Sequence, residues 1–188
     1  MKIRLAYALA AVAVMAVMAC QPGKTKSQST PVEAATAAPQ DTASHEDELV
    51  ISFTMTDMNG NNVAVTDEFA KHQLTIIDFW ASWCGPCRQE MPSLVKTYND
   101  YKDKGLGIVG VSLDEDKEQW SSAVSAMGMT WTQLSDLQGW HNAAAQTYGI
   151  QAIPFTIVVD DKGKVLTAGL RGEELRAFVA QRLDGKSE

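Results

Sequence analysis

Two cysteines separated by two residues stand between a strand pattern and a helix pattern, and this placement constrains the fold more than any other feature. Residues 74–80 form an apolar run interrupted by only two polar residues, which predicts a central strand buried on both faces. Apolar residues then recur at helical spacing over 88–104. Cys84 and Cys87 lie between the two patterns. The pair is therefore predicted at the start of a helix that follows a buried strand.

That position gives the two thiols different roles. Cys84, the nearer to the helix N-terminus, faces unpaired backbone N–H groups and the positive end of the helix dipole. Both favour the thiolate, which is the nucleophilic form. Pro86 is tolerated in a first helical turn because its missing N–H costs little there. We predict that Cys84 is the exposed attacking thiol and Cys87 the resolving thiol.

The rest of the chain alternates strand and helix patterns. An Asn-Gly turn at 59–60 follows the first strand pattern, and a second turn lies at 160–163. The predicted strands are 50–56, 107–113, 130–133, 155–159 and 164–168, and the further helices are 116–127, 139–148 and 173–183. Such alternation, ended by a hairpin and a helix, predicts an α/β domain with a mixed sheet.

The N-terminus reads as an export signal. Lys2 and Arg4 precede an apolar stretch over 6–19, which is shorter than the roughly 20 residues of a membrane-spanning helix. A charged start, a short apolar middle and a small residue at the exit predict a signal peptide over 1–19. An ordinary cleaved signal and an uncleaved anchor helix are the alternatives to the lipoprotein leader described next.

Val17-Met18-Ala19-Cys20 resembles a bacterial lipobox, although Met18 is not the usual small residue. The resemblance implies that Cys20 is acylated and that the chain is lipid-anchored to a bacterial membrane, facing the periplasm or the cell exterior, because several acyl chains give durable attachment. Residues 21–48 are rich in Ala, Thr, Ser, Gln and Pro and lack aromatics, so we expect a flexible linker over 20–48 and a folded domain over 49–188.

Composition excludes several functions. The net charge of −7 gives no basic face for nucleic acid. Three cysteines are too few for a disulfide framework. The glycines form no nucleotide-binding motif, and no second pair of Cys or His ligands accompanies the two close cysteines. We therefore predict no cofactor and no metal, and we expect a monomer.

Three segments resemble thioredoxin. The stretch Asp78-Phe79-Trp80-Ala81-Ser82-Trp83-Cys84-Gly85-Pro86-Cys87 is similar to its active-site segment, Pro92 matches the proline in its active-site helix, and residues 148–154 resemble its cis-proline segment. Residues 88–92 and 111–114 are similar to the TlpA/ResA branch of membrane-attached thioredoxins. The resemblance implies a thioredoxin-like mixed sheet flanked by helices, with an N-terminal β-hairpin extension and a central strand-helix insertion.

The resemblance also implies roles for two acids. Asp78 matches the buried acid of thioredoxin, whose pKa desolvation would raise and which could exchange a proton with Cys87. Glu90 matches an acid of the ResA type that lies close to the cysteines and tunes them. The alternatives are a merely structural buried acid at Asp78 and, at Glu90, an acid that only interacts favourably with the dipole of its own helix.

Other residues are expected to form the substrate surface. A cis Pro154 would hold Ile153 beside the disulfide, where its backbone could pair with an extended substrate segment. Trp83, Gly85 and Pro86 would complete that surface. The remaining tryptophans are expected in the core, with a partner surface as the alternative for the last three: Trp80, Trp120, Trp131 and Trp140.

The predicted function is that of an exported thiol–disulfide oxidoreductase that reduces proteins, for example apocytochrome c, with electrons from a membrane dithiol donor. Zinc or copper binding by the two cysteines, a purely structural disulfide and a non-catalytic redox-sensing or binding lipoprotein are alternatives. A peroxiredoxin-like peroxidase is a further one, although the usual Pro-x-x-x-Thr-x-x-Cys pattern is absent.

Overall fold

The structure, a computed structural model, describes residues 48–185. The strands are β1 Thr54–Thr56, β2 Asn62–Ala64, β3 Leu74–Trp80, β4 Leu106–Ser112, β5 Thr132–Leu134, β6 Phe155–Asp160 and β7 Val165–Ala168. The helices are α1 Val65–Phe69, α2 Gly85–Tyr101, α3 Lys117–Ala126, α4 Ala143–Thr147 and α5 Gly172–Asp184, with short 3₁₀ turns η1 Lys102–Lys104 and η2 Gly139–His141. Within these residues no helix has the length and apolarity to cross a bilayer. The predicted signal peptide, Cys20 and the linker as far as residue 47 lie outside the described residues.

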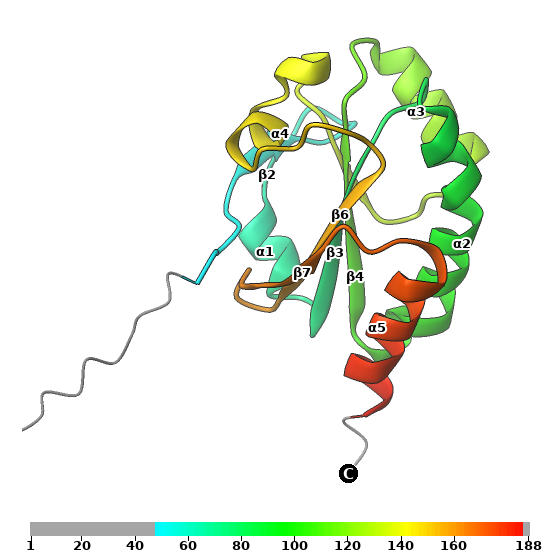
Figure 1. Cartoon of the computed structure of the whole chain (residues 1–188). Coiled ribbons are helices and arrows are strands. Elements are labelled where there is room, and N and C mark those ends of the chain that lie inside the picture. Colours follow the sequence, from blue (N-terminus) through cyan, green and yellow to red (C-terminus); the bar gives the residue numbers. More distant parts are fainter. Residues whose placement is uncertain (1–47, 186–188) are drawn as a thin grey trace, which may run out of the picture. The chain divides into compact units, whose positions relative to one another are not determined.

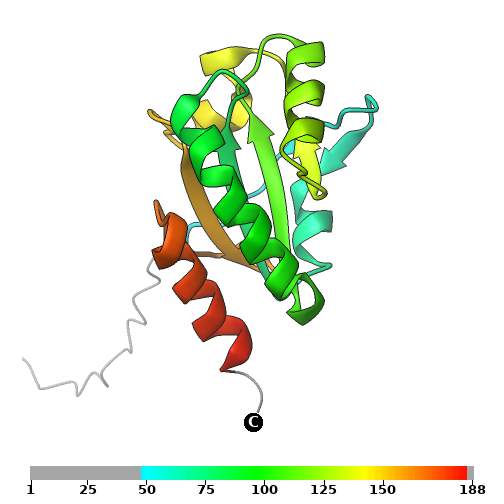
Figure 2. The same cartoon turned by 90° about the vertical axis from the view of Figure 1, so that its right-hand side faces the viewer.

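A mixed sheet organises the domain. Its strand order is β5-β4-β3-β6-β7, with β3 parallel to β4 and antiparallel to β6. Figures 1 and 2 show α2, α3 and α5 on one face of this sheet and α1 and α4 on the other. Cover on both faces explains why every residue of β3 and of β4 is buried. The predicted thioredoxin-like architecture is confirmed, including the β1–β2 hairpin and the inserted α3 and β5.

The chain enters this domain along the outer edge of β7. Val50 forms an antiparallel bridge with Lys164, and the Leu49 carbonyl accepts a hydrogen bond from Val165 N–H at 2.9 Å. These contacts lie at the end of the sheet where β6 finishes, opposite the end where β3 leads into α2. The predicted strand over 50–56 is therefore wrong in extent: only 54–56 pairs as a strand with β2.

Helix α2 begins earlier than its apolar spacing predicts, because the Cys84 side chain caps it and Gly85 and Pro86 occupy the first positions. Its inner face is buried every three or four residues, at Cys87, Met91, Leu94, Thr97 and Tyr101. Burying an apolar side chain of this size contributes about 1.5–3 kcal/mol, so this face fixes the helix on the sheet.

Two helical predictions need correction. The short helix over 139–148 is two pieces, because Asn142 has an extended ψ of 126° and its side chain caps α4. The segment over 102–104 is a 3₁₀ turn ended by Gly105 at φ 100°, a conformation that suits glycine. Helix α1 was not predicted, since five residues carry too little periodic signal.

Candidate functional site

The two cysteines form a disulfide at the junction of β3 and α2. The S–S bond is 2.04 Å long, and the backbone N–H of Cys87 lies 3.2 Å from Cys84 Sγ. This contact places Cys84 sulfur at the unpaired amides of the helix start, as predicted. The predicted exposure of Cys84 is wrong for this oxidised state: its side chain is buried, though less than that of Cys87. The segment before Pro154 lies against its sulfur.

That segment contains a cis peptide bond between Ile153 and Pro154. The carbonyl oxygen of Ile153 lies 3.8 Å from Cys84 Sγ. Because a disulfide sulfur carries no proton, this is a van der Waals contact and not a hydrogen bond. Ile153 and Pro154 remain partly exposed. Their backbone is thus available beside the sulfur that an incoming molecule would meet.

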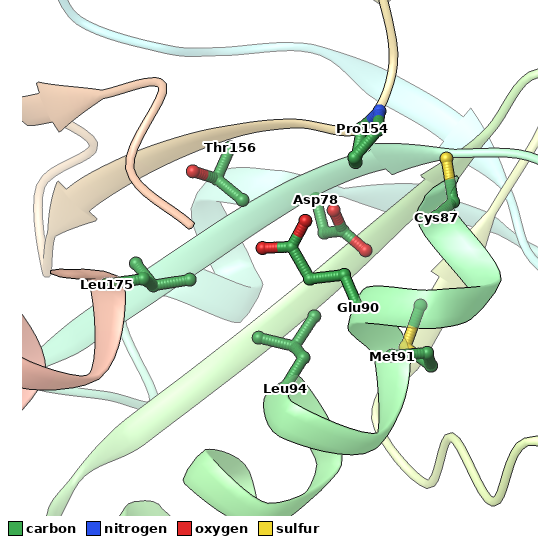
Figure 3. A pocket seen from close by; sticks show the side chains of 8 residues that line it. All are labelled: Asp78, Cys87, Glu90, Met91, Leu94, Pro154, Thr156 and Leu175. Atoms are coloured by element: carbon green, nitrogen blue, oxygen red, sulfur yellow. The ribbon is translucent and has the colours of Figure 1, made fainter. Parts of the chain in front are cut away.

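Two carboxyl groups lie beneath the disulfide. Asp78 on β3 and Glu90 on α2 line a cavity of about 10 Å³, room for roughly one water molecule, together with Cys87 and Pro154. Figure 3 shows the two carboxyl groups side by side at this cavity. Burial raises the pKa of Asp78 to about 7, and the negative charge of Glu90 adds to the rise. Among the described residues none forms a hydrogen bond with Asp78. The alternative, a structural acid paired with a backbone amide, is therefore not observed.

Glu90 has a partner that its sequence position does not reveal. Its carboxylate accepts a hydrogen bond from the backbone N–H of Gly172, the first residue of α5, at 2.9 Å. Arg171, the N-cap of that helix, provides no side-chain cap. Glu90 therefore interacts with the start of α5 rather than only with the dipole of its own helix. This contact also fixes the carboxylate beside Asp78.

Sequence reasoning missed Asp114 as a residue of the site. Its buried carboxylate accepts hydrogen bonds from the backbone N–H of Ser82 at 3.0 Å, from Ser82 Oγ at 2.6 Å and from Ser112 Oγ at 2.6 Å. These bonds hold the segment that leads from β3 to Cys84. The only sequence signal was the likeness of residues 111–114 to the TlpA/ResA branch, which gave Asp114 no role.

Replacing Asp114 with alanine is expected to lower the free energy of unfolding by about 2–3 kcal/mol, because hydrogen bonds to a charged group are lost and the Ser82 amide is left unpaired. Urea denaturation of the oxidised protein measures this change. Asp161→Ala, an exposed turn acid, is the matched control and is expected within about 0.5 kcal/mol of wild type. A loss for Asp114→Ala as small as that of the control would contradict the role.

The tryptophans separate into core and surface. The core prediction is confirmed for Trp80, Trp120 and Trp131, and Trp80 Nε1 donates to Gln133 Oε1 at 3.2 Å. It is wrong for Trp140, which is 41% exposed. Trp140 lies on η2, and a single 3₁₀ turn gives no periodicity from which its exposure could be inferred.

Trp83 also lies on the surface, beside Cys84. It is 53% exposed, and its ring centroid lies 6.4 Å from that of Trp140. Gly85 and Pro86, at the start of α2, are exposed as well. The structure thus brings Trp83, Gly85, Pro86 and the Ile153–Pro154 bond to one end of the domain, and Cys20 alone of the predicted site residues lies outside the described part. Between residues 48 and 185, no three His, Cys, Asp or Glu side chains are grouped to hold a metal ion.

Comparison with known proteins agrees with this geometry. A family model described as Redoxin matches residues 34–180. The thiol-disulfide oxidoreductase ResA of Bacillus thuringiensis subsp. konkukian is 29% identical over 132 residues, 70% of this chain and 73% of that protein. The thiol:disulfide interchange protein HelX of Rhodobacter capsulatus is 35% identical over 112 residues, 60% of each. The crystal structure of the thioredoxin domain of a Bacteroides vulgatus thiol-disulfide oxidoreductase superposes with a TM-score of 0.65 and 35% identity, over 71% of this chain and 94% of that one. The chain therefore belongs to the Redoxin family and is a thiol–disulfide oxidoreductase with the thioredoxin fold.

Proposed function

We propose that this protein works as a reductase of disulfide bonds in exported proteins, with Cys84 as attacking and Cys87 as resolving thiol. The observation that carries the proposal is the asymmetry of the disulfide. Cys84 contacts the carbonyl of Ile153, a partly exposed residue, whereas Cys87 faces the cavity that holds Asp78. Cys84 Sγ is thus positioned to react with a substrate, and Cys87 Sγ is positioned to exchange a proton with Asp78.

In the reduced protein, Cys84 thiolate attacks one sulfur of the substrate disulfide. A Cys84–substrate bond forms, and the other substrate sulfur leaves as a thiolate that takes up a proton. Cys87 then loses its proton to Asp78 and attacks Cys84 Sγ. The Cys84–Cys87 disulfide closes and the second substrate thiolate leaves. With a pKa of about 7, Asp78 can accept that proton near neutral pH.

Substrate recognition in this proposal uses the surface beside Cys84. The backbone of Ile153, held by the cis Pro154, pairs with an extended segment of the substrate. Trp83, Gly85 and Pro86 contact the same segment from the other side of the sulfur. Glu90 acts on the reaction through Asp78, whose pKa its charge raises.

The cellular setting extends the proposal. Residues 1–19 direct export, Cys20 carries the lipid, and residues 21–48 connect the anchor to a monomeric domain. Substrates are then extracytoplasmic proteins, apocytochrome c cysteines among them. Each turnover transfers two electrons from the Cys84–Cys87 dithiol to the substrate. A membrane dithiol donor then supplies two electrons that reduce the disulfide again.

The reduction potential tests the direction of the reaction. We expect the Cys84–Cys87 pair of the full-length protein, equilibrated in dithiothreitol buffers, to lie near or below roughly −250 mV, as in thioredoxin. Insulin reduction by the dithiothreitol-reduced protein should follow. A value near roughly −120 mV would mark an oxidant and contradict the reductase assignment, and faster turnover with hydrogen peroxide than with insulin would indicate a peroxidase.

A further inference from the structure

Large hydrophobic side chains are exposed at two places in the described domain. Leu49 and Val50 lie beside the start of β7, at the end of the sheet opposite the disulfide. Trp83 and Trp140 lie at the disulfide end, with their ring planes inclined at 53°. Figures 1 and 2 both place the yellow segment around residue 140 at the end where α2 begins. We call Trp83 and Trp140 the aromatic surface.

The backbone of Trp140 is held in place although the residue is exposed. Gln146 Nε2 donates a hydrogen bond to the Trp140 carbonyl at 2.7 Å. The carboxylate of Asp136 accepts one from Asn142 Nδ2 and one from Ala143 N–H, each at 2.8 Å. These bonds hold both ends of η2. A backbone held in this way need not be ordered when a partner covers Trp140, which favours binding.

The aromatic surface continues the site around the disulfide. Trp83 precedes Cys84 directly, and the Ile153 carbonyl lies 3.8 Å from Cys84 Sγ. A segment bonded to Cys84 would lie next to Trp83, whose ring centroid is 6.4 Å from that of Trp140. Tryptophans at such positions commonly carry a large share of binding energy because they bury much apolar area. Trp140 comes from the segment between β5 and β6, distant in sequence from the cysteines.

We propose that Trp140 is a specificity-determining residue, which with Trp83 binds a large apolar or aromatic side chain next to the reactive cysteine of the substrate protein. This inference rests on the proposed thiol exchange at Cys84 and adds the kind of sequence that the enzyme favours. The two indoles offer apolar ring surface, and the nearby Asp136 carboxylate is already occupied by its own hydrogen bonds.

The test compares extended peptides in which phenylalanine, alanine or lysine adjoins a single cysteine that forms a mixed disulfide with glutathione. Cys84 thiolate attacks the peptide sulfur, the Cys84–peptide bond forms, and the electron pair of the old bond leaves with glutathione thiolate. We expect kcat/KM of the reduced full-length protein to be roughly tenfold higher for the phenylalanine peptide than for the alanine peptide. In Trp140→Ala this ratio should fall to about twofold.

Two variants complete the experiment. Trp140→Phe should restore a ratio of at least about fivefold, because an aromatic ring is retained. Leu49→Ala removes an exposed hydrophobic side chain at the end of the sheet opposite the disulfide, and its ratio of kcat/KM values should equal that of wild type. An unchanged ratio in Trp140→Ala, an equal fall in Leu49→Ala, or a wild-type preference for the lysine peptide would each overturn the proposal. A strongly oxidising potential of the same preparations would contradict only the reductase direction, since the peptides compare one exchange step.

Discussion

Replacing Cys87 with serine is expected to stop insulin reduction and to leave the substrate covalently attached to Cys84. In this variant the attack by Cys84 still occurs, but no thiol remains to release the mixed disulfide. Turnover should fall by at least about a thousandfold, because residues that act as one unit each carry most of the catalysis. Non-reducing mass spectrometry should find about one adduct per chain.

The different surroundings of the two sulfurs support this assignment of roles. Cys84 contacts Ile153, which is partly exposed, whereas Cys87 lines the cavity with Asp78. We therefore expect a macromolecular disulfide to react at the first sulfur. Cys84→Ser is the matched variant: it should lose turnover equally and form no adduct. Adducts of similar yield on the two single variants would show that the two thiols are interchangeable and would contradict the mechanism.

Replacing Asp78 with asparagine is expected to stabilise the oxidised protein at pH 8 and at the same time to slow its reaction. The pKa of Asp78 is about 7 in the folded protein, through burial and the charge of Glu90, against an ordinary value of 3.8. Below about pH 4 both the folded and the unfolded state bind the proton, so Asp78 contributes nothing to the pH dependence of the free energy of unfolding. Between about pH 4 and 7 only the folded state retains it, and stability decreases as pH rises.

Above about pH 7 the folded protein contains the ionised Asp78 carboxylate, and the full free-energy cost of burying this charge is present. Asp78→Asn removes it, so the free energy of unfolding should rise by about 2–4 kcal/mol at pH 8 and change little near pH 4. Urea denaturation at the two pH values measures this difference. Asp161→Asn, at an exposed turn, is the control and should show no such pH dependence.

The same variant should reduce insulin turnover at pH 7 by roughly tenfold to a hundredfold, because asparagine cannot accept the proton of Cys87. Greater stability with lower activity distinguishes a proton carrier from a structural acid, whose loss would lower both. Wild-type turnover in Asp78→Asn would contradict the role of Asp78 in the proposed mechanism.

Local features of the sequence predicted the reactive centre well. The apolar run of β3, the two cysteines and the helical spacing after them are contiguous, so the strand–disulfide–helix unit follows from short-range rules. The place of Asp78 beneath Cys87 also follows, because both lie within ten residues of the chain. The mixed sheet was predictable for the same reason, from strand and helix patterns read one after another.

Contacts between distant segments could not be predicted in this way. The bonds from Asp114 to Ser82 and from Glu90 to Gly172 join residues 32 and 82 positions apart, and no periodicity encodes them. The position of Trp140 beside Trp83 likewise depends on how η2 is held by bonds around Asp136. Sequence patterns describe which face of an element is buried, whereas these residues lie on loops and helix ends where no face repeats.

The bridge between Val50 and Lys164 fixes where the chain enters the domain. The chain enters the domain at the end of the sheet where β3 begins. The seven residues of β3, about 23 Å long, separate that point from the disulfide. Residue 48 and the reactive disulfide therefore lie at opposite ends of the sheet, so a group that reacts with Cys84 approaches the domain at the end away from residue 48.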